Sequence, residues 1–256
     1  MVNNPSRESL PGIPSDVSAG PETLAPTARG AMLYDASCCG QPDERLFERD
    51  RWRSQGALEE SAGGRGTVAF IRDGERRWVL RHYRRGGLVA KLLGDNYLWT
   101  GADRTRAFRE WRLLRELRAA GLPVPEPVAA RYERSGLFYR ADLITAELPT
   151  RRTLTHALSA GPLDPATWHA LGSCVGRLHA RGVHHADLNA HNLLLGHDGT
   201  VYVLDFDRGR IRPRGAWEQA VLERLQRSLR KVTATMPAGR FDEAAWQDLL
   251  QGLKDG

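Results

Sequence analysis

The segment HHADLNAHNLLL, residues 184–195, places histidines, an aspartate and two asparagines directly before three consecutive leucines. The leucines are typical of a short buried strand, so the polar residues form the loop that enters it. A helix is predicted immediately upstream, with Asp164 as its N-cap and Gly182 at its end. A polar loop held between a helix and a strand is a common position for functional side chains.

The spacing within this loop follows the pattern H-x-D-L-x-x-x-N, given by His185, Asp187 and Asn192. In that pattern the aspartate accepts a hydroxyl proton and the asparagine is a ligand for Mg²⁺, whereas His185 is expected to fix the loop. An apolar strand then ends at Asp205-Phe206-Asp207, where Asp205 corresponds to a second magnesium ligand. Two motifs in this order predict phosphoryl transfer from ATP, with Asp187 as the catalytic residue. The roles of Asn189 and His191 stay open.

The nucleotide side of such a site is predicted from weaker signals. The glycines of GGRGTV, above all Gly64 and Gly66, allow backbone N–H groups to approach phosphates, although such a cluster is more often a simple turn. Arg81 ends an apolar strand where the kinase pattern has lysine. Glu110, on the next helix, is its expected partner, although a lone helical glutamate is more often a surface residue. Glu147 and Leu148 are the expected contacts of the adenine.

The order of predicted elements gives the fold class. Residues 1–30 are rich in proline and serine and are predicted to be a disordered tail. Strands are expected at 67–71, 78–83, 128–133, 137–145 and 200–207, and helices at 106–121, 164–182, 215–231 and 242–253. We predict an α+β, bilobal, protein-kinase-like fold. An N-terminal lobe (31–148) holds an antiparallel β-sheet with one helix, and the C-terminal lobe (149–256) is mainly helical.

Composition limits the classes of partner and compartment. The chain has 256 residues and a formal net charge of +6, which favours anionic partners. The arginines are spread along the chain without a recognised nucleic-acid module, so no nucleic-acid partner is expected. An odd number of cysteines, and the lack of a long apolar run or signal segment, predict a protein of the cytoplasm without a membrane span.

Two departures from the protein-kinase pattern concern the acceptor. Ala186 replaces the arginine of H-R-D, which argues against activation by phosphorylation of a loop. Only about eight residues separate Asp207 from the next predicted helix, and no A-P-E sequence follows. A polypeptide-docking region is therefore not expected, and the pattern indicates a small-molecule or glycolipid acceptor.

The chain resembles the 3-deoxy-D-manno-octulosonic acid (Kdo) kinases of Gram-negative lipopolysaccharide synthesis. The resemblance covers about residues 60–210, through GRGT at 64, LRHYRRGGLVAKLLGD at 80, GLPVPEPVAAR at 121, DLNAHNLLL at 187 and LDFDRG at 204. It implies ATP-dependent phosphorylation of the 4-hydroxyl of Kdo on Kdo-lipid A precursor, by a peripheral protein at the cytoplasmic face of the inner membrane. By position, Asp187 is the catalytic aspartate, and Asn192 and Asp205 are the Mg²⁺ ligands. Arg81 agrees with that family, and the role of Asp207 stays open.

Alternatives remain at this point. Residues 84–99 and the helix from Trp217 combine basic and apolar side chains, which either rest on an anionic membrane or simply pack on the core. The same catalytic residues would serve a kinase of a soluble molecule such as an aminoglycoside or choline. A nucleotide-binding pseudokinase is a further alternative, suggested by Arg81 and Asp207. No obligate protein partner is predicted.

Overall fold

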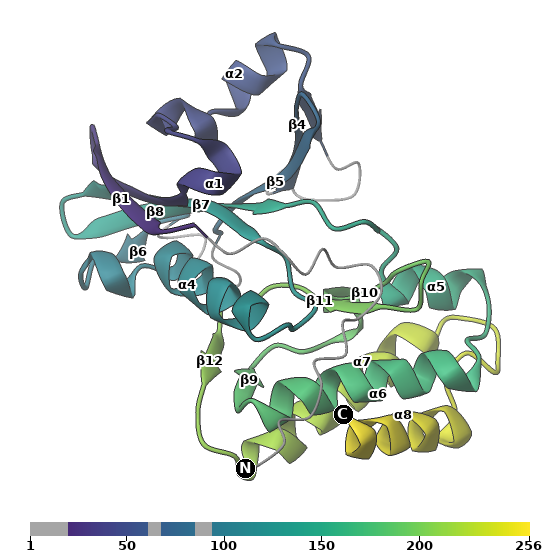
Figure 1. Ribbon diagram of the computed structural model, residues 1–256. Coiled ribbons are helices and arrows are strands. Elements are labelled where there is room, and N and C mark those ends of the chain that lie inside the picture. Colours follow the sequence, from purple (N-terminus) through teal and green to yellow (C-terminus); the bar gives the residue numbers. More distant parts are fainter. Residues whose placement is uncertain (1–19, 61–67, 85–93) are drawn as a thin grey trace, which may run out of the picture.

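The structure is a computed structural model that describes residues 20–60, 68–84 and 94–256. Its first lobe comprises β1 (Glu22–Thr27), β2 (Gly30–Asp35), α1 (Ala36–Cys39), the 3₁₀ helix η1 (Glu44–Phe47), α2 (Arg49–Ser54), β3 (Leu58–Glu60), β4 (Val68–Asp73), β5 (Arg76–His82), β6 (Tyr97–Leu98), η2 (Ala102–Arg104), α4 (Arg106–Ala119), β7 (Pro127–Ser135) and β8 (Phe138–Ala146). The second comprises α5 (Leu154–Ala160), α6 (Pro165–Ala180), β9 (Val183–His185), η3 (Ala190–Asn192), β10 (Leu193–Leu195), β11 (Val201–Val203), β12 (Gly209–Ile211), α7 (Trp217–Thr233) and α8 (Glu243–Asp255). Figure 1 shows the sheet lobe above the helical lobe. The predicted α+β, kinase-like bilobal fold is confirmed.

The sheet of the first lobe is antiparallel, in the order β1-β2-β7-β8-β5-β4-β3, with β6 paired to β8. The predicted hairpin is present: β4 and β5 pair from Val68↔Arg81 to Asp73↔Arg76. Gly74 closes the turn with a φ of 60°, a conformation that glycine adopts without steric cost. On its other side β5 pairs with β8, so Arg81 lies opposite Leu143. These two pairings fix the position of Arg81 in the lobe.

The prediction that residues 1–30 form a disordered tail is wrong in part. Residues 22–27 belong to the segment predicted as a disordered tail, but they form β1 and pair with β2 along its length. The prediction rested on the high proline content of this segment. However, β1 is the edge strand of the sheet, and an edge strand tolerates a proline such as Pro26. Residues 1–19 lie outside the described part of the chain.

Helices cover both faces of the sheet (Figure 1). The predicted helix α4 packs on one face through Phe108, Trp111 and Leu114, all buried. On the other face η1 and α2 bury Phe47 and Trp52 against strand residues such as Trp78. The lobe therefore has short helical segments as well as the helix predicted at 106–121. One face of β5 is buried under the layer of η1 and α2 through Trp78 and Leu80, whereas Arg81 lies on the opposite face of the strand.

The second lobe is built around α6, which begins as predicted. Asp164 caps it by accepting a hydrogen bond from the Thr167 N–H, and Pro165 occupies its first turn. In α7 the apolar residues Val221, Leu225 and Leu229 are buried in the core. This face of α7 therefore packs against the protein, which was one of the two alternatives for its amphipathic pattern.

Two small strand pairs join the helices to the region between the lobes. β10 pairs with β11 and β9 pairs with β12, both antiparallel. The first pair ends at Leu193 and Val203, so Asn192 and Leu204 lie next to each other just beyond it. In the second pair His185 lies opposite Gly209. The residues of HHADLNAHNLLL therefore lie beside those of the 205–207 segment. No helix among residues 20–60, 68–84 and 94–256 is both long and apolar enough to cross a bilayer.

Close contact between α6 and α8 generates a prediction about stability. A Cβ added at Gly252 would lie 1.9 Å from the His169 carbonyl oxygen, and one at Gly172 would lie 1.9 Å from that of Leu249. We expect Gly252→Ala to lower the free energy of unfolding by roughly 1–3 kcal/mol, because the helices must move apart. Urea unfolding followed by circular dichroism measures the change. Gly215→Ala is the control, since its Cβ would meet only Trp217 at 3.9 Å; equal stability of the two variants would contradict the prediction.

Candidate active site

A cavity of about 590 Å³ lies between the lobes. Its apolar walls suit an adenine ring and come from strands of the first lobe and from the 192–204 region: Val68, Phe70, Val79, Leu143, Ala146, Leu194 and Leu204. The predicted residues that line it are Arg81, Glu110, Glu147, Leu148, Asn192 and Asp205. Six residues from five separate parts of the sequence thus meet in one cavity. Gly64 and Gly66 fall outside the described residues.

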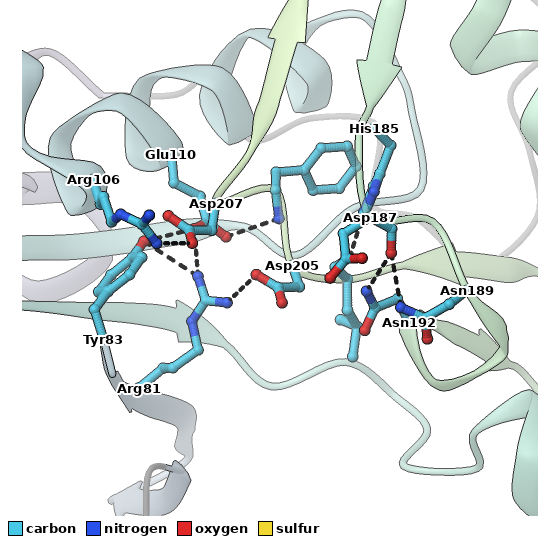
Figure 2. Close-up of polar contacts among 12 residues, drawn as sticks. Arg81, Tyr83, Arg106, Glu110, His185, Asp187, Asn189, Asn192, Asp205 and Asp207 are labelled. Atoms are coloured by element: carbon cyan, nitrogen blue, oxygen red, sulfur yellow. Dashed lines mark hydrogen bonds and ion pairs between the residues drawn. The ribbon is translucent and has the colours of Figure 1, made fainter. Parts of the chain in front are cut away.

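Arg81 connects the lobes at the inner end of the cavity (Figure 2). One guanidinium nitrogen donates to Glu110 of α4, and the other donates to Oδ1 of Asp205 at 2.5 Å. Arginine suits this position because its fork of donors can hold two carboxylates at once. The predicted Arg81–Glu110 pair is present, and Asp205 is a second anion on the same cation.

Glu110 is almost fully buried and is held by two further donors. The hydroxyl of Tyr83 donates to Oε2 of Glu110 at 2.6 Å, and the backbone N–H of Phe206 donates to Oε1 at 3.0 Å. Tyr83 was not predicted. Its position two residues after Arg81 on one strand face was the available signal, because alternate residues of a strand point the same way.

The environment of Asp205 favours its ionised form. Burial opposes the charge, but the Arg81 guanidinium outweighs burial and holds the pKa of Asp205 below its usual range. Its backbone is also unusual: φ is 62°, the only positive value among the described non-glycine residues. A residue that carries a side chain rarely adopts this backbone conformation, which persists where surrounding contacts hold it. The carboxylate is thereby aimed at the cavity as an anion.

The loop of residues 185–192, which carries the predicted catalytic residue Asp187, is organised around the backbone carbonyl of Asp187. The side-chain amides of Asn189 and Asn192 donate to this oxygen at 2.7 and 3.1 Å. Asn189 also accepts from the N–H of His191 at 2.9 Å, which begins η3. Figure 2 shows both asparagines converging on this loop. Asn189, which the sequence left without a role, therefore shapes the backbone that carries Asp187.

His185 links the 185–192 loop to the Asp205 segment. It is 2% exposed, its Nε2–H donates to the Leu204 carbonyl at 2.8 Å, and its ring packs on that of Phe206 with centroids 4.8 Å apart. Burial lowers the pKa of His185, so the neutral ring is favoured. Its Nδ1 has no hydrogen-bond partner among the described residues.

Asp207 anchors the other end of the same segment. Its Oδ2 accepts a hydrogen bond from Arg106, the first residue of α4, at 2.5 Å. Burial raises the pKa of Asp207. The side chain therefore points away from Asp205 toward α4 (Figure 2), and it ties the helix that carries Glu110 to the 205–207 turn.

The donor set suits a magnesium ion. Asn192 and Asp205 line the same cavity, and the Leu204 N–H donates to the Asn192 carbonyl at 2.8 Å, which holds the two residues together. Asn192 uses its amide nitrogen toward Asp187, so its amide oxygen is left for another partner. One carboxylate and one amide oxygen are ligands that Mg²⁺ accepts, with nucleotide phosphates and waters completing the shell.

At the outer edge of the cavity Glu147 and Leu148 follow β8. The Glu147 N–H donates to the carbonyl of Arg77 at 2.9 Å, so this donor extends the hydrogen bonding between β8 and β5. Its carboxylate accepts from Arg151, whose guanidinium also pairs with Glu59 and covers the ring of Phe70 at 3.7 Å. Arg151 was not predicted. It closes this edge of the cavity, and two of its partners, Glu59 and Phe70, are distant from it in the sequence.

Comparison with known proteins identifies relatives over most of the chain. The sequence model of the lipopolysaccharide kinase (Kdo/WaaP) family matches residues 49–252. A protein named 3-deoxy-D-manno-octulosonic acid kinase from Stenotrophomonas maltophilia is 47% identical over 205 residues, which cover 79% of this chain and 81% of the relative. Proteins of the same name from Vibrio parahaemolyticus and Xanthomonas axonopodis pv. citri are 40% and 45% identical, over 78% and 82% of this chain and 84% and 86% of theirs.

The Arg106–Asp207 pair gives a testable coupling. We expect Arg106→Gln and Asp207→Asn each to lower the free energy of unfolding by roughly 1–3 kcal/mol, because each leaves a partly buried charge without its partner. The double variant should lose less than the sum of the two changes. Urea unfolding of the four proteins measures the cycle, and strictly additive losses would show that the two side chains do not interact.

Protonation of His185 gives a prediction for pH dependence. Its pKa is lowered in the folded protein, so below about pH 6.5 the unfolded chain binds the proton more readily and stability falls with falling pH. We expect the free energy of unfolding to drop less between pH 7.5 and 5.5 in His185→Gln than in the wild type. The exposed His197→Gln is the control and should follow the wild type. An unchanged pH dependence in His185→Gln would count against this assignment.

Proposed function

The chain belongs to the lipopolysaccharide kinase (Kdo/WaaP) family, and we propose that it phosphorylates the 4-hydroxyl of a Kdo residue on Kdo-lipid A precursor in lipopolysaccharide core biosynthesis. It is an ATP-dependent phosphotransferase with an alcohol group as acceptor. The observation that carries the proposal is the convergence of Arg81, Glu110, Asn192 and Asp205 on one cavity, with Asp187 on the adjoining loop. The relatives named as Kdo kinases support the identity of the acceptor.

Asp187 is the proposed catalytic residue. The acceptor hydroxyl lies against its carboxylate, which orients the oxygen and takes its proton as the bond to the γ-phosphorus forms. The bond between that phosphorus and the β–γ bridging oxygen breaks, and ADP leaves with the electron pair. Two hydrogen bonds to the Asp187 carbonyl hold the backbone of this residue in place, so its carboxylate reaches the acceptor from a fixed point.

The nucleotide is held by charge. Arg81 is anchored by Glu110, so its guanidinium is fixed at the inner end of the cavity, where the phosphates of ATP are proposed to lie. Asn192 and Asp205 are the proposed ligands of Mg²⁺, which when bound neutralises phosphate charge. Glu147 and Leu148 are the proposed neighbours of the adenine, in the apolar part of the cavity.

The surface beside the catalytic loop supports a polyanionic acceptor. Four exposed arginines flank or belong to β12: Arg208 precedes the strand, Arg210 lies on it, and Arg212 and Arg214 follow it. Arg214 is paired with Glu218. Because β12 pairs with β9, this basic segment runs next to the strand that leads into Asp187. Such a surface favours a phosphorylated lipid and an anionic bilayer, and we propose peripheral binding at the cytoplasmic face of the inner membrane. Residues 85–93, which include most of the other predicted membrane segment, lie outside the described chain.

The two alternatives are less well supported. A kinase of a soluble molecule would share the catalytic residues, but the relatives are named for a lipopolysaccharide sugar. A pseudokinase would not need Asp187, Asn192 and Asp205 together with a linked Arg81–Glu110 pair. Neither alternative explains the exposed arginines beside the catalytic loop.

The proposal is tested by mass spectrometry of Kdo-lipid A precursor after incubation with the protein and Mg·ATP. We expect the acceptor to gain one phosphate, and we expect Asp187→Asn to lower kcat by roughly 10²–10⁴-fold because the proton acceptor is lost. Calorimetric binding of Mg·ATP should persist in this variant. Asp198→Asn, in the exposed turn after β10, is the control and should keep full activity. Full activity of Asp187→Asn would refute the assignment of the catalytic residue.

A further inference from the structure

Helix α7 lies directly on the catalytic loop. Ser228 accepts a hydrogen bond from the Ala190 N–H at 3.1 Å, which fastens the helix to η3. Arg224 lies one turn earlier on the same side of α7, and its guanidinium donates to Oδ1 of Asp187. Residues four apart on a helix share a face, so one contact positions the other. The helix therefore carries a cation to the carboxylate that is proposed to accept the proton.

The Arg224–Asp187 pair differs from the buried pair at Arg81. The side chains of Arg224 and Asp187 are 48% and 42% exposed, respectively, whereas Glu110 is buried at 2%. Exposed ion pairs contribute little to stability, because water solvates both charges and the side chains remain mobile. Arg224 can therefore leave Asp187 at low cost, while the Arg81 pair cannot separate so easily. A guanidinium stays charged at all relevant pH values, so Arg224 remains a cation for another anion.

We propose that Arg224 binds the carboxylate of the sugar acid acceptor, and that this exchange of partners releases Asp187 to receive the hydroxyl proton. The inference rests on the proposed function, because a Kdo residue is an octulosonic acid and carries a carboxylate on the same ring system as its hydroxyls. An arginine recognises a carboxylate through two parallel hydrogen bonds. The acceptor carboxylate then replaces the Asp187 carboxylate as the partner of Arg224, with no change in net charge.

This role makes Arg224 a determinant of specificity. An acceptor without the carboxylate leaves Arg224 paired with Asp187. The hydroxyl of that acceptor then approaches an aspartate that is still bound to the guanidinium. An acceptor with the carboxylate draws the guanidinium away and positions its own hydroxyl in one step. Selection therefore depends on an anionic group beside the reacting hydroxyl, and the phosphates of the lipid portion do not substitute for it.

The test compares two acceptors that differ only at the carboxyl group: Kdo-lipid A precursor, and the same glycolipid with that carboxyl reduced to an alcohol. Both keep the lipid phosphates, so the two sources of negative charge are separated. We expect the wild-type protein to prefer the acid by roughly 10- to 100-fold in kcat/KM, the effect of a hydrogen bond to a charged group. Arg224→Gln should raise KM for the acid and remove this preference, while Arg224→Lys should restore part of it.

Arg112→Gln is the matched control, because Arg112 is also a helical arginine paired with carboxylates, Glu22 and Asp103, but on α4. It should keep the preference for the acid. Equal losses on both acceptors in Arg224→Gln would overturn the inference while leaving the proposed function intact, since Arg224 would then act only on Asp187. A wild-type protein that phosphorylates neither acceptor would overturn the proposed function, and this inference with it.

Discussion

The buried charges around Arg81 constrain the rest of the site. A guanidinium inside a protein must be compensated, because an unpaired charge in a low-dielectric interior costs several kcal/mol. Here the compensation comes from Glu110 of α4 and from Asp205 of the segment after β11. One cation thus requires a strand and a helix of the first lobe to meet a turn of the second.

Each partner of Arg81 is in turn held by its own neighbours. Tyr83 and the Phe206 N–H satisfy Glu110, and His185 binds the carbonyl of Leu204 just before Asp205. Arg106 fastens Asp207 on the other side. These contacts support the left-handed backbone of Asp205, a conformation that residues other than glycine rarely adopt. The result is a fixed arrangement of charge, which is the main means by which phosphoryl-transfer enzymes lower the barrier.

The proposed acceptor side is organised differently. The backbone of the 185–192 loop is fixed by Asn189 and Asn192, but the Asp187 carboxylate is partly exposed to solvent and pairs with an exposed arginine. Rigid charges at the nucleotide and exchangeable charges at the acceptor suit the proposed reaction. The nucleotide phosphates need the same contacts in every cycle, whereas the base must be free only when the acceptor is bound.

The sequence by itself determined the fold class and most of the proposed site, because these depend on local patterns. The H-x-D-L-x-x-x-N spacing, the Asp205-Phe206-Asp207 segment and the order of Arg81 and Glu110 are visible in one dimension. The hairpin at Asp73–Gly74 and the cap at Asp164 are visible for the same reason. Tertiary structure alone decided that Tyr83 holds Glu110, that Arg106 holds Asp207 and that Arg224 reaches Asp187. It also decided that the proline-bearing residues 22–27 form an edge strand. The three side-chain pairings join residues that are 27, 101 and 37 positions apart, and which partners meet depends on how whole elements pack. The strand at 22–27 pairs with its neighbour β2, but its place at the edge of the sheet depends on the pairing of β2 with the distant β7. Local spacing therefore does not specify these partners.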